Sequence, residues 1–154
     1  MKKYIPFFCL LILTFSACKK SDSFDPAKQA IADDGEIQAY LTTNNITGAT
    51  KDASGLYYKV ITPGTGNYPT ISSTITVNST GKLLDGTLFD TENALVTPLT
   101  NVIRGWQIGV PHINTGGRLL LIVPSALGYG NAAADTIPKN SVLVFTIDLL
   151  GYSN

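Results

Sequence analysis

The sequence contains few residues that could carry acid–base, nucleophilic or metal chemistry. His112 is the only histidine, and no cysteine or acidic residue stands near it at metal-ligand spacing. Ser125 follows a proline and lacks the Gly-x-Ser-x-Gly pattern that exposes a nucleophilic serine. Asp85 and Asp90 lie in a hairpin-like segment and do not resemble paired glycosidase carboxylates, although their spacing alone leaves that chemistry open. We therefore expect a function that needs no metal and no cofactor.

One segment could instead build an apolar pocket. Apolar residues recur there at helical spacing, so one short helix would place all of them on the same face: Ile103, Trp106, Val110 and Ile113. Pro111 is unsuited to a helix interior, so we expect this helix to end near Val110. A tryptophan at the start of a short helix that packs across a sheet can form the floor of a pocket, or it can simply fill the core. The segment alone is compatible with both interpretations.

The sequence around this segment is of β type. Four segments have strand-like sequence and are separated by turn-forming residues: 55–61, 74–80, 118–123 and 141–150. The second alternates and places Ser79 on its inward face, and the last is apolar on both faces, which indicates a central strand. Asp85-Gly86 indicates a hairpin turn between the second segment and Phe89. The pattern predicts an α+β fold, an antiparallel sheet with one short helix laid across it.

A helical segment precedes this domain. Residues 26–43 have helical sequence, and Pro26 suits a first helical turn. Asp33 and Glu36 resemble a capping box, so a second helix could begin at Asp33, although Gly35 disfavours helix there. We expect residues 26–54 to form a helical segment and linker that packs on the domain at 55–151 or projects from a tether. A spacer or dimerisation role is the alternative.

The first residues have the sequence of a targeting segment. Lys2 and Lys3 are followed by an apolar run too short to span a bilayer, and small residues then precede Cys18. This order resembles a bacterial lipoprotein signal, which implies that residues 1–17 are removed and that the Cys18 thiol is lipidated. An ordinary secretory signal with an incidental cysteine is the alternative.

The lipoprotein resemblance implies an exported protein that is anchored to a bacterial membrane through lipid on Cys18. We expect the outer membrane, with the protein facing the periplasm or the cell surface, and residues 18–25 as a tether. Loss of the leader would also remove Cys9, which leaves no cysteine pair for a disulfide or a cysteine-based metal site. The chain has 11 basic and 11 acidic residues and no basic face with interleaved aromatics, so we expect no nucleic-acid partner.

A set of short motifs stands in a fixed order along residues 55–150. It comprises Gly81, Asp85-Gly86-Thr87, Phe89-Asp90, Val102-Ile103-Arg104-Gly105-Trp106, Gly117, Pro124, Tyr129-Gly130, Ile137-Pro138 and Leu143-Val144-Phe145. This set resembles the FKBP (FK506-binding-protein) type of peptidyl-prolyl cis-trans isomerase. The resemblance implies a curved antiparallel β-sheet wrapped around one short α-helix, which agrees with the fold predicted from the residues alone. It also implies an isomerase that accelerates rotation about Xaa–Pro bonds of exported proteins during folding. Proline-containing polypeptides would be its substrates, and FK506-like macrolides would be ligands.

The resemblance also implies a set of pocket residues. Phe89 and Asp90 match one wall of the family's pocket, and Val102 and Ile103 match the lip before the helix. Trp106 matches the floor, Tyr129 the hydroxyl donor, and Phe145 a second, aromatic wall. In the lip, the Ile103 N–H would bind carbonyl groups of the ligand.

The sequence departs from the family pattern at several places. Ser79 stands where the family often has tyrosine, and an aromatic residue expected near residues 96–97 is absent, a space that we expect Leu99 to fill in part. The loop 131–136 lacks an aromatic residue or histidine, and Ile137 follows it as a weaker pocket candidate. We therefore expect a wider and less aromatic pocket. A weakly catalytic or non-catalytic chaperone of the same fold is the main alternative, and a purely structural lipoprotein is a third.

Overall fold

The structure is a computed structural model that describes residues 24–154. The predicted leader, Cys18 and most of the predicted tether therefore lie outside the described residues. The elements follow in this order: helix α1 (Pro26–Thr43), strands β1 (Thr50–Lys51), β2 (Tyr57–Thr62), β3 (Thr74–Leu83) and β4 (Leu88–Pro98), the 3-10 turn η1 (Leu99–Asn101), helix α2 (Arg104–Gly109), the 3-10 turn η2 (Val110–His112), strand β5 (Arg118–Val123), the 3-10 turn η3 (Ser125–Leu127) and strand β6 (Leu143–Ser153). Within residues 24–154, neither helix has both the length and the apolar character that crossing a bilayer requires.

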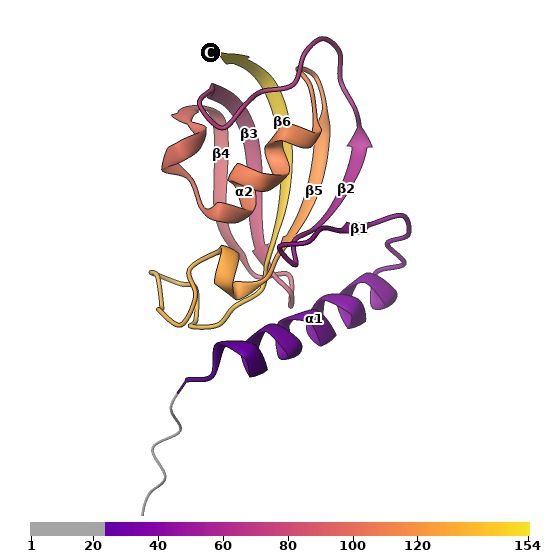
Figure 1. Cartoon of the computed structure of the whole chain (residues 1–154), viewed down its shortest axis with the longest axis vertical. Coiled ribbons are helices and arrows are strands. Elements are labelled where there is room, and N and C mark those ends of the chain that lie inside the picture. Colours follow the sequence, from indigo (N-terminus) through magenta and orange to yellow (C-terminus); the bar gives the residue numbers. More distant parts are fainter. Residues whose placement is uncertain (1–23) are drawn as a thin grey trace, which may run out of the picture.

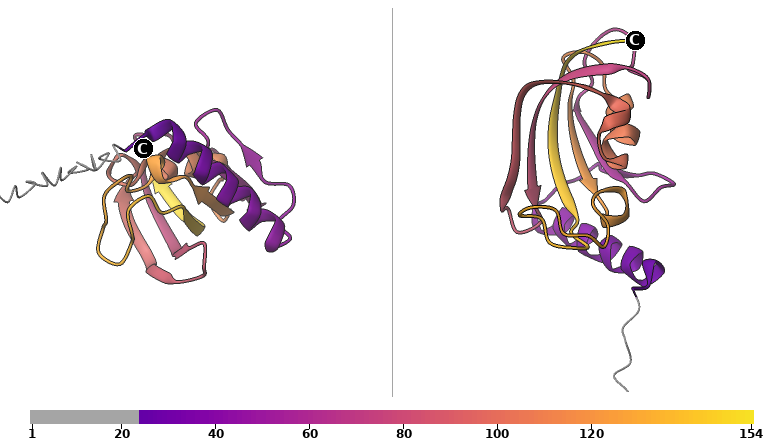
Figure 2. Two further views of the ribbon diagram at one scale, coloured as in Figure 1. Left: turned by 90° about the horizontal axis from the view of Figure 1, so that it is seen from below. Right: turned by 90° about the vertical axis from the view of Figure 1, so that its left-hand side faces the viewer.

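The strands form one six-stranded antiparallel sheet in the order β1-β2-β5-β6-β3-β4. The sheet curves around α2, and α1 crosses one end of the sheet (Figures 1 and 2). Strand β6 lies between β5 and β3 and is buried on both faces. Its residues Phe145 and Ile147 belong to the main core with Trp106, whereas Val144 belongs to a second apolar cluster with α1. The predicted α+β fold with a curved antiparallel sheet, one short helix and a preceding helix is confirmed.

Helix α2 approaches β5 closely through two glycines. An ideal Cβ built on Gly105 would lie 2.5 Å from a Val123 methyl group, and one on Gly109 would lie 2.4 Å from a Leu121 methyl group. Because neither position carries a side chain, the helix backbone can lie against the sheet, and Trp106 on the same helix is only 4% exposed. The helix ends at Gly109 and continues as the η2 turn, in agreement with the prediction from proline.

Helix α1 is continuous through Asp33, where the sequence predicted that a second helix could begin. Its N-cap is Asp25, whose carboxylate accepts hydrogen bonds from the N–H groups of the first turn, and Pro26 occupies the first helical position. The prediction that a second helix begins at Asp33 is wrong. The Asp33 carboxylate caps no helix turn of its own but is buried against the domain, and Gly35 is accommodated on the exposed side of α1.

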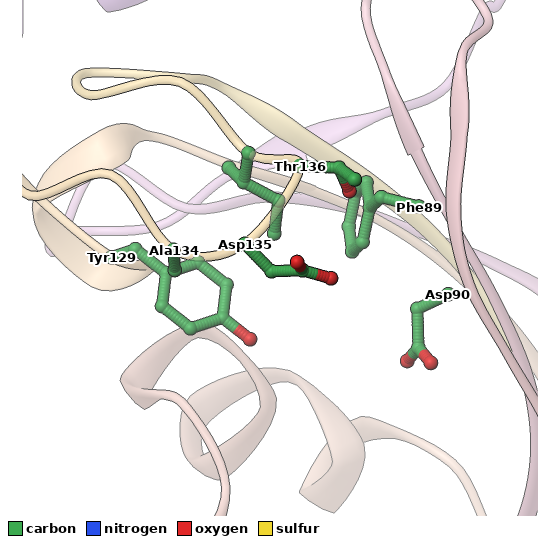
Figure 3. Close-up of a pocket in the computed structure, with 7 residues that line it drawn as sticks. Phe89, Asp90, Tyr129, Ala134, Asp135 and Thr136 are labelled. Atoms are coloured by element: carbon green, nitrogen blue, oxygen red, sulfur yellow. The ribbon is translucent and has the colours of Figure 1, made fainter.

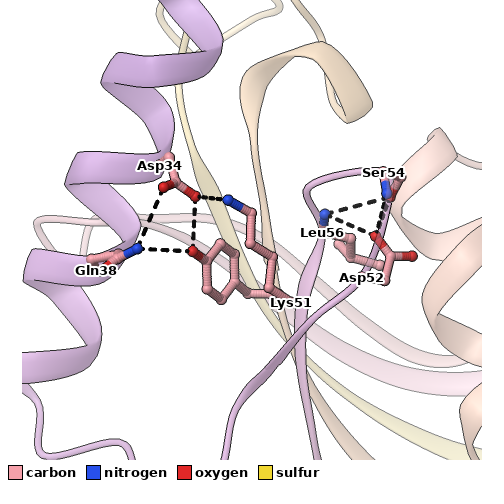
Figure 4. A network of polar contacts seen from close by, with 7 residues as sticks. Asp34, Gln38, Lys51, Asp52, Ser54 and Leu56 are labelled. Carbon is pink, nitrogen blue, oxygen red and sulfur yellow. Dashed lines mark hydrogen bonds and ion pairs between the residues drawn. The ribbon is translucent and has the colours of Figure 1, made fainter.

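Polar and apolar contacts fix α1 against the end of the sheet at which β2 and β6 begin and β5 ends. Ile37 is fully buried with Tyr57, Ile122 and Val144. Beside this cluster, the Tyr57 hydroxyl donates to Asp34 Oδ1 at 2.8 Å, and Lys51 forms an ion pair with the same carboxylate (Figure 4). Helix α1 is therefore part of the folded unit.

Candidate functional site

A cavity of about 300 Å³ lies between the start of α2, the middle of β4 and the loop after η3. We call it the Trp106 cavity. Its lining combines apolar, aromatic, polar and acidic side chains: Asp90, Glu92, Leu95, Asn101, Val102, Ile103, Trp106, Tyr129 and Phe145. Trp106 and Phe145 are 4% and 3% exposed and form its floor, whereas Val102 and Ile103 are half-buried at its edge.

Three aromatic rings pack edge to face beneath this cavity. Phe145 lies between the other two, with its ring centroid 5.4 Å from that of Trp106 and 5.5 Å from that of Phe89, at interplanar angles near 90°. Such perpendicular pairs are favourable because the positive edge of one ring meets the negative face of the next. Gly81 permits the arrangement, since a Cβ there would lie 2.6 Å from the Phe89 ring and 2.9 Å from Phe145. The floor of the cavity is thus an apolar surface of closely packed aromatic rings.

Two irregularities in β4 aim its residues at the site. Gly81 pairs with Asp90 and Lys82 pairs with Leu88, so Phe89 is the extra residue of a β-bulge. In a regular strand, adjacent residues such as Phe89 and Asp90 point to opposite faces. The bulge lets both of them line the same cavity. A second extra residue of β4 lies between Glu92, which pairs with Ser79, and Leu95, which pairs with Val77. Because of it, the side chains of β4 that face inward are at even-numbered positions up to Glu92 and at odd-numbered positions from Leu95 onward.

A second cavity of about 260 Å³ adjoins the first, and we call it the loop cavity. It is lined by side chains of β4 and of the loop between η3 and β6: Phe89, Asp90, Tyr129, Ala134, Asp135, Thr136 and Ile137. Asp90 and Tyr129 line both cavities. In Figure 3 the Tyr129 hydroxyl and the Asp135 carboxylate point toward the side of the cavity on which Asp90 lies. The two cavities together therefore form one extended site.

The site offers hydrogen-bond donors and negative charge. Trp106 Nε1 is buried without a partner, and neither the Ile103 N–H nor the Tyr129 hydroxyl is donated to any other residue of the described part of the chain. Three carboxylates line the two cavities, namely Asp90, Glu92 and Asp135, and none of them forms an ion pair within residues 24–154. The arrangement can hold an apolar group over Trp106 and donate hydrogen bonds to carbonyl oxygens at the edge.

The structure brings together all seven residues of the predicted pocket. Phe89, Asp90, Val102, Ile103, Trp106, Tyr129 and Phe145 each line at least one of the two cavities. Of the three weaker candidates, Ile137 lines the loop cavity, but Ser79 and Leu99 line neither. Leu99 is fully buried in the core, where its N–H donates to the Ser73 carbonyl. The expectation that Leu99 fills the pocket is therefore corrected, because Leu95 occupies that side of the cavity.

Several lining residues escape prediction from the sequence: Glu92, Leu95, Asn101, Ala134, Asp135 and Thr136. Glu92 lies two residues after Asp90 on the same strand, and period-two alternation could have found it. Leu95 carries no such signal, because the bulge that turns it inward leaves no clear mark in the sequence. The loop residues depend on the path of the chain between η3 and β6.

The single histidine takes no part in this site. The His112 ring stacks on Tyr58, with ring centroids 4.1 Å apart and an interplanar angle of 9°. Residues 24–154 contain no group of three or more His, Cys, Asp or Glu side chains arranged to hold a metal ion.

Known proteins share this sequence pattern and architecture. A sequence model of the FKBP-type peptidyl-prolyl cis-trans isomerase family matches residues 66–150. The FKBP-type peptidyl-prolyl cis-trans isomerase FkpA of Escherichia coli (strain K12) is 40% identical over 107 residues, which are 67% of this chain and 40% of FkpA. The peptidyl-prolyl cis-trans isomerase Mip of Coxiella burnetii is 37% identical over 119 residues, which are 73% of this chain and 52% of Mip.

The fold agrees with a solved structure of one of these relatives. The crystal structure of FkpA from Escherichia coli superposes with a TM-score of 0.72 and 34% sequence identity, over 82% of this chain and 62% of that chain. The present chain thus spans about half or less of the length of these two curated relatives. The family model covers more than half of the chain, and the ordered motifs converge on one cavity. This chain belongs to the FKBP-type peptidyl-prolyl cis-trans isomerase family.

Proposed function

We propose that this protein is a peptidyl-prolyl cis-trans isomerase that accelerates rotation about Xaa–Pro bonds in polypeptides. The observation that carries the proposal is the Trp106 cavity, with its edge-to-face aromatic floor and its unpaired donors at Ile103 and Tyr129. Membership in the family gives this chemistry its precedent.

The reaction needs no covalent intermediate. The barrier to rotation is roughly 20 kcal/mol because twisting the C–N bond breaks amide resonance. The twisted amide is less dipolar than the planar amide, so an apolar site poor in water favours it over the ground state. A site that holds the proline ring and leaves the preceding carbonyl free to rotate therefore lowers the barrier.

Each part of the cavity has a role in this mechanism. The proline ring packs on the floor formed by Trp106 and Phe145, beside the apolar edge at Val102. The Ile103 N–H and the Tyr129 hydroxyl donate to substrate carbonyls and hold the chain while the bond turns. Asp90 orients the substrate or repels a carbonyl oxygen, and it exchanges no proton in this mechanism.

The main alternative is a peptide-binding chaperone of the same fold with little turnover. It is favoured by Ser79, which stands at the core position where the family often has tyrosine, and by the exposure of Tyr129, which is 43%. In that case the cavity would bind proline-containing or apolar segments without stabilising the twisted amide.

We also propose where the protein acts. Its first residues resemble a lipoprotein signal, so lipid on Cys18 would anchor it to a bacterial membrane, with exported proteins as its substrates. Mass spectrometry of the protein isolated from its own cells tests this, since a diacylglyceryl group on an N-terminal Cys18 is the expected product. An intact leader or an unmodified Cys18 would contradict it.

The isomerase proposal is tested by NMR exchange spectroscopy on a blocked Ala-Leu-Pro-Phe peptide with the full-length chain in mild detergent. We expect accelerated cis/trans exchange, a loss of about tenfold in kcat/KM in Tyr129→Phe from one missing hydrogen bond, and a larger loss in Trp106→Phe. Tyr58→Phe is the matched control, because the Tyr58 ring stacks on His112 outside both cavities. Peptide binding that depends on Trp106 without accelerated exchange would establish the chaperone alternative instead. The absence of both peptide binding and accelerated exchange would refute the isomerase and the chaperone proposals.

A further inference from the structure

Asp33 is the one carboxylate among the buried polar side chains of residues 24–154, and the isomerase mechanism makes no use of it. It is 1% exposed. Asp33 Oδ2 accepts hydrogen bonds from the Ser125 N–H at 2.8 Å and from the Ser125 hydroxyl at 2.7 Å, and Oδ1 accepts from Gln29 Nε2 at 2.7 Å. No lysine, arginine or histidine of the described residues pairs with it.

Attaching α1 through the buried Asp33 carboxylate costs desolvation free energy. A buried carboxylate without a cation is stabilised only by its hydrogen bonds, and an apolar residue on the same helix face would pack without that cost. Hydrogen bonds, however, fix position and direction more narrowly than apolar contacts do. Asp33 therefore fixes one point of α1 against Ser125, a residue 92 positions away in the sequence.

Ser125 is in turn bonded to both neighbours of Tyr129. The Ser125 carbonyl accepts hydrogen bonds from the Gly128 N–H at 3.0 Å and from the Gly130 N–H at 2.8 Å. Tyr129 lies between these two glycines, and its side chain lines both cavities. A continuous series of hydrogen bonds thus runs from Asp33 through Ser125 to the backbone that carries Tyr129.

Helix α1 also holds the far end of the same loop. Ile37, one turn after Asp33, is buried in a cluster that includes Val142, which directly precedes β6. Between the two ends, the Asn140 N–H donates to the Gly130 carbonyl at 2.8 Å and closes the loop on itself. Both ends of the segment 125–142 are therefore fixed to α1.

We propose that Asp33 is a positioning residue of the functional site: through Ser125 it holds Tyr129 in the place where its hydroxyl meets the substrate. Helix α1 lies outside residues 66–150, which the family model covers, yet by this inference it belongs to the functional unit. The inference rests on the proposed isomerase function, because it gives Asp33 a role in that same site. Asp33 itself touches no substrate.

The test compares Asp33→Ala with Asp34→Ala in the full-length chain in mild detergent. The control removes the neighbouring carboxylate, which joins α1 to Lys51 and Tyr57 and makes no contact with the loop. We expect Asp33→Ala to lower kcat toward the Ala-Leu-Pro-Phe peptide by about tenfold, the equivalent of one lost hydrogen bond, with KM little changed. Asp33→Asn, which keeps one acceptor oxygen, should lie between Asp33→Ala and the wild type. Asp34→Ala should lower thermal stability but keep kcat within about twofold of the wild type.

A double-mutant cycle with Tyr129→Phe separates positioning from general destabilisation. If Asp33 acts through the Tyr129 hydroxyl, Asp33→Ala should have less than about a twofold effect once that hydroxyl is gone. A full additive loss in the Tyr129→Phe background would overturn the inference. So would a folded Asp33→Ala protein with wild-type kcat.

Amide hydrogen exchange gives a readout that does not depend on activity. The N–H groups of Gly128 and Gly130 should exchange faster in Asp33→Ala than in the wild type, and at the wild-type rate in Asp34→Ala. Unchanged exchange in Asp33→Ala would overturn the inference. A wild-type protein without isomerase activity would refute the proposed function alone, and the exchange rates would still decide whether Asp33 holds the Tyr129 segment.

Discussion

Asp90 and Tyr129 each line both cavities, and neither side chain has a hydrogen-bond or ion-pair partner within residues 24–154. A polypeptide that extends from one cavity to the other would therefore lie near both the Asp90 carboxylate and the Tyr129 hydroxyl, and both groups are free to bind it. Glu92 adds a carboxylate to the Trp106 cavity and Asp135 adds one to the loop cavity, and no lysine or arginine lines either of them. Each of the two cavities thus presents carboxylates beside its aromatic residues.

Substrates with a basic residue next to proline should bind better than acidic ones. We expect Ala-Lys-Pro-Phe to bind roughly fivefold more tightly than Ala-Glu-Pro-Phe at low salt, because a solvent-exposed charge pair contributes up to about 1 kcal/mol. The difference should shrink as salt screens the charges. Isothermal titration calorimetry at two ionic strengths measures it. Asp90→Asn should reduce the preference, whereas Asp85→Asn, which removes an equal charge outside both cavities, should not.

Gly81→Ala should damage the floor of the site. The new methyl group would lie 2.6 Å from the Phe89 ring and 2.9 Å from the Phe145 ring, so both rings must move. We expect a loss of about 1–3 kcal/mol in the free energy of unfolding, measured by urea titration, together with weaker peptide binding. Gly151→Ala is the control, because Gly151 lies in β6 and nothing stands within 4 Å of the place that a Cβ added there would take. Equal stability of the two variants would show that the Phe89 and Phe145 rings can accommodate the added methyl group without loss of stability.

The elements of this fold can be predicted where local pattern decides them. The sequence of residues 118–123 predicts a strand ended by proline, and β5 has those bounds, because an apolar run followed by Pro124 leaves little choice. The α1 segment is also predictable, because Pro26 suits a first helical turn and the residues after it have helical sequence. Its internal detail is not: Asp33 has the sequence of a cap, but its carboxylate bonds to Ser125, and only the tertiary fold brings these residues together.

The candidate site shows the same limit. Residues near α2, such as Trp106, can be predicted because a short amphipathic helix displays them in a fixed order. The lining from β4 depends on two bulges. An extra residue between Glu92 and Leu95, where Ala94 has φ 52°, turns Leu95 inward and leaves Val96 64% exposed. No periodic pattern encodes such an insertion, so the sequence alone places Leu99 at the cavity instead.

Acid should weaken the attachment of α1. The hydrogen bond from Lys51, followed by that from Tyr57, lowers the pKa of Asp34 from its ordinary value of 3.8. The unfolded chain therefore binds a proton at Asp34 more readily than the folded chain does. This contribution to stability is fully present above about pH 4 and is lost as the pH falls through the lower pKa of the folded state.

Thermal unfolding followed by circular dichroism between pH 2 and 7 measures this effect. Asp34→Asn should flatten the fall in unfolding temperature below about pH 4 relative to the wild type. The hydrogen bond from Arg118, the first residue of β5, likewise lowers the pKa of Asp148 on the adjacent strand β6. Asp148→Asn should therefore remove a separate part of the acid-dependent fall in unfolding temperature. An Asp34→Asn protein with the full acid dependence of the wild type would show that the Lys51–Asp34 pair contributes nothing to folding.

Ser79→Ala should leave the protein at least as stable as the wild type. Ser79 is 4% exposed on the inward face of β3, and its hydroxyl has no hydrogen-bond partner within the described chain. A buried hydroxyl without a partner costs about 1–3 kcal/mol, and its removal leaves only a space the size of one oxygen atom. We expect an unchanged or higher free energy of unfolding in urea and unchanged peptide affinity, because Ser79 lines neither cavity. Ser125→Ala is the matched comparison, since it removes a buried hydroxyl that does donate a hydrogen bond, and it should be destabilising. If Ser79→Ala is destabilised as much as Ser125→Ala, the Ser79 hydroxyl has a partner in solution.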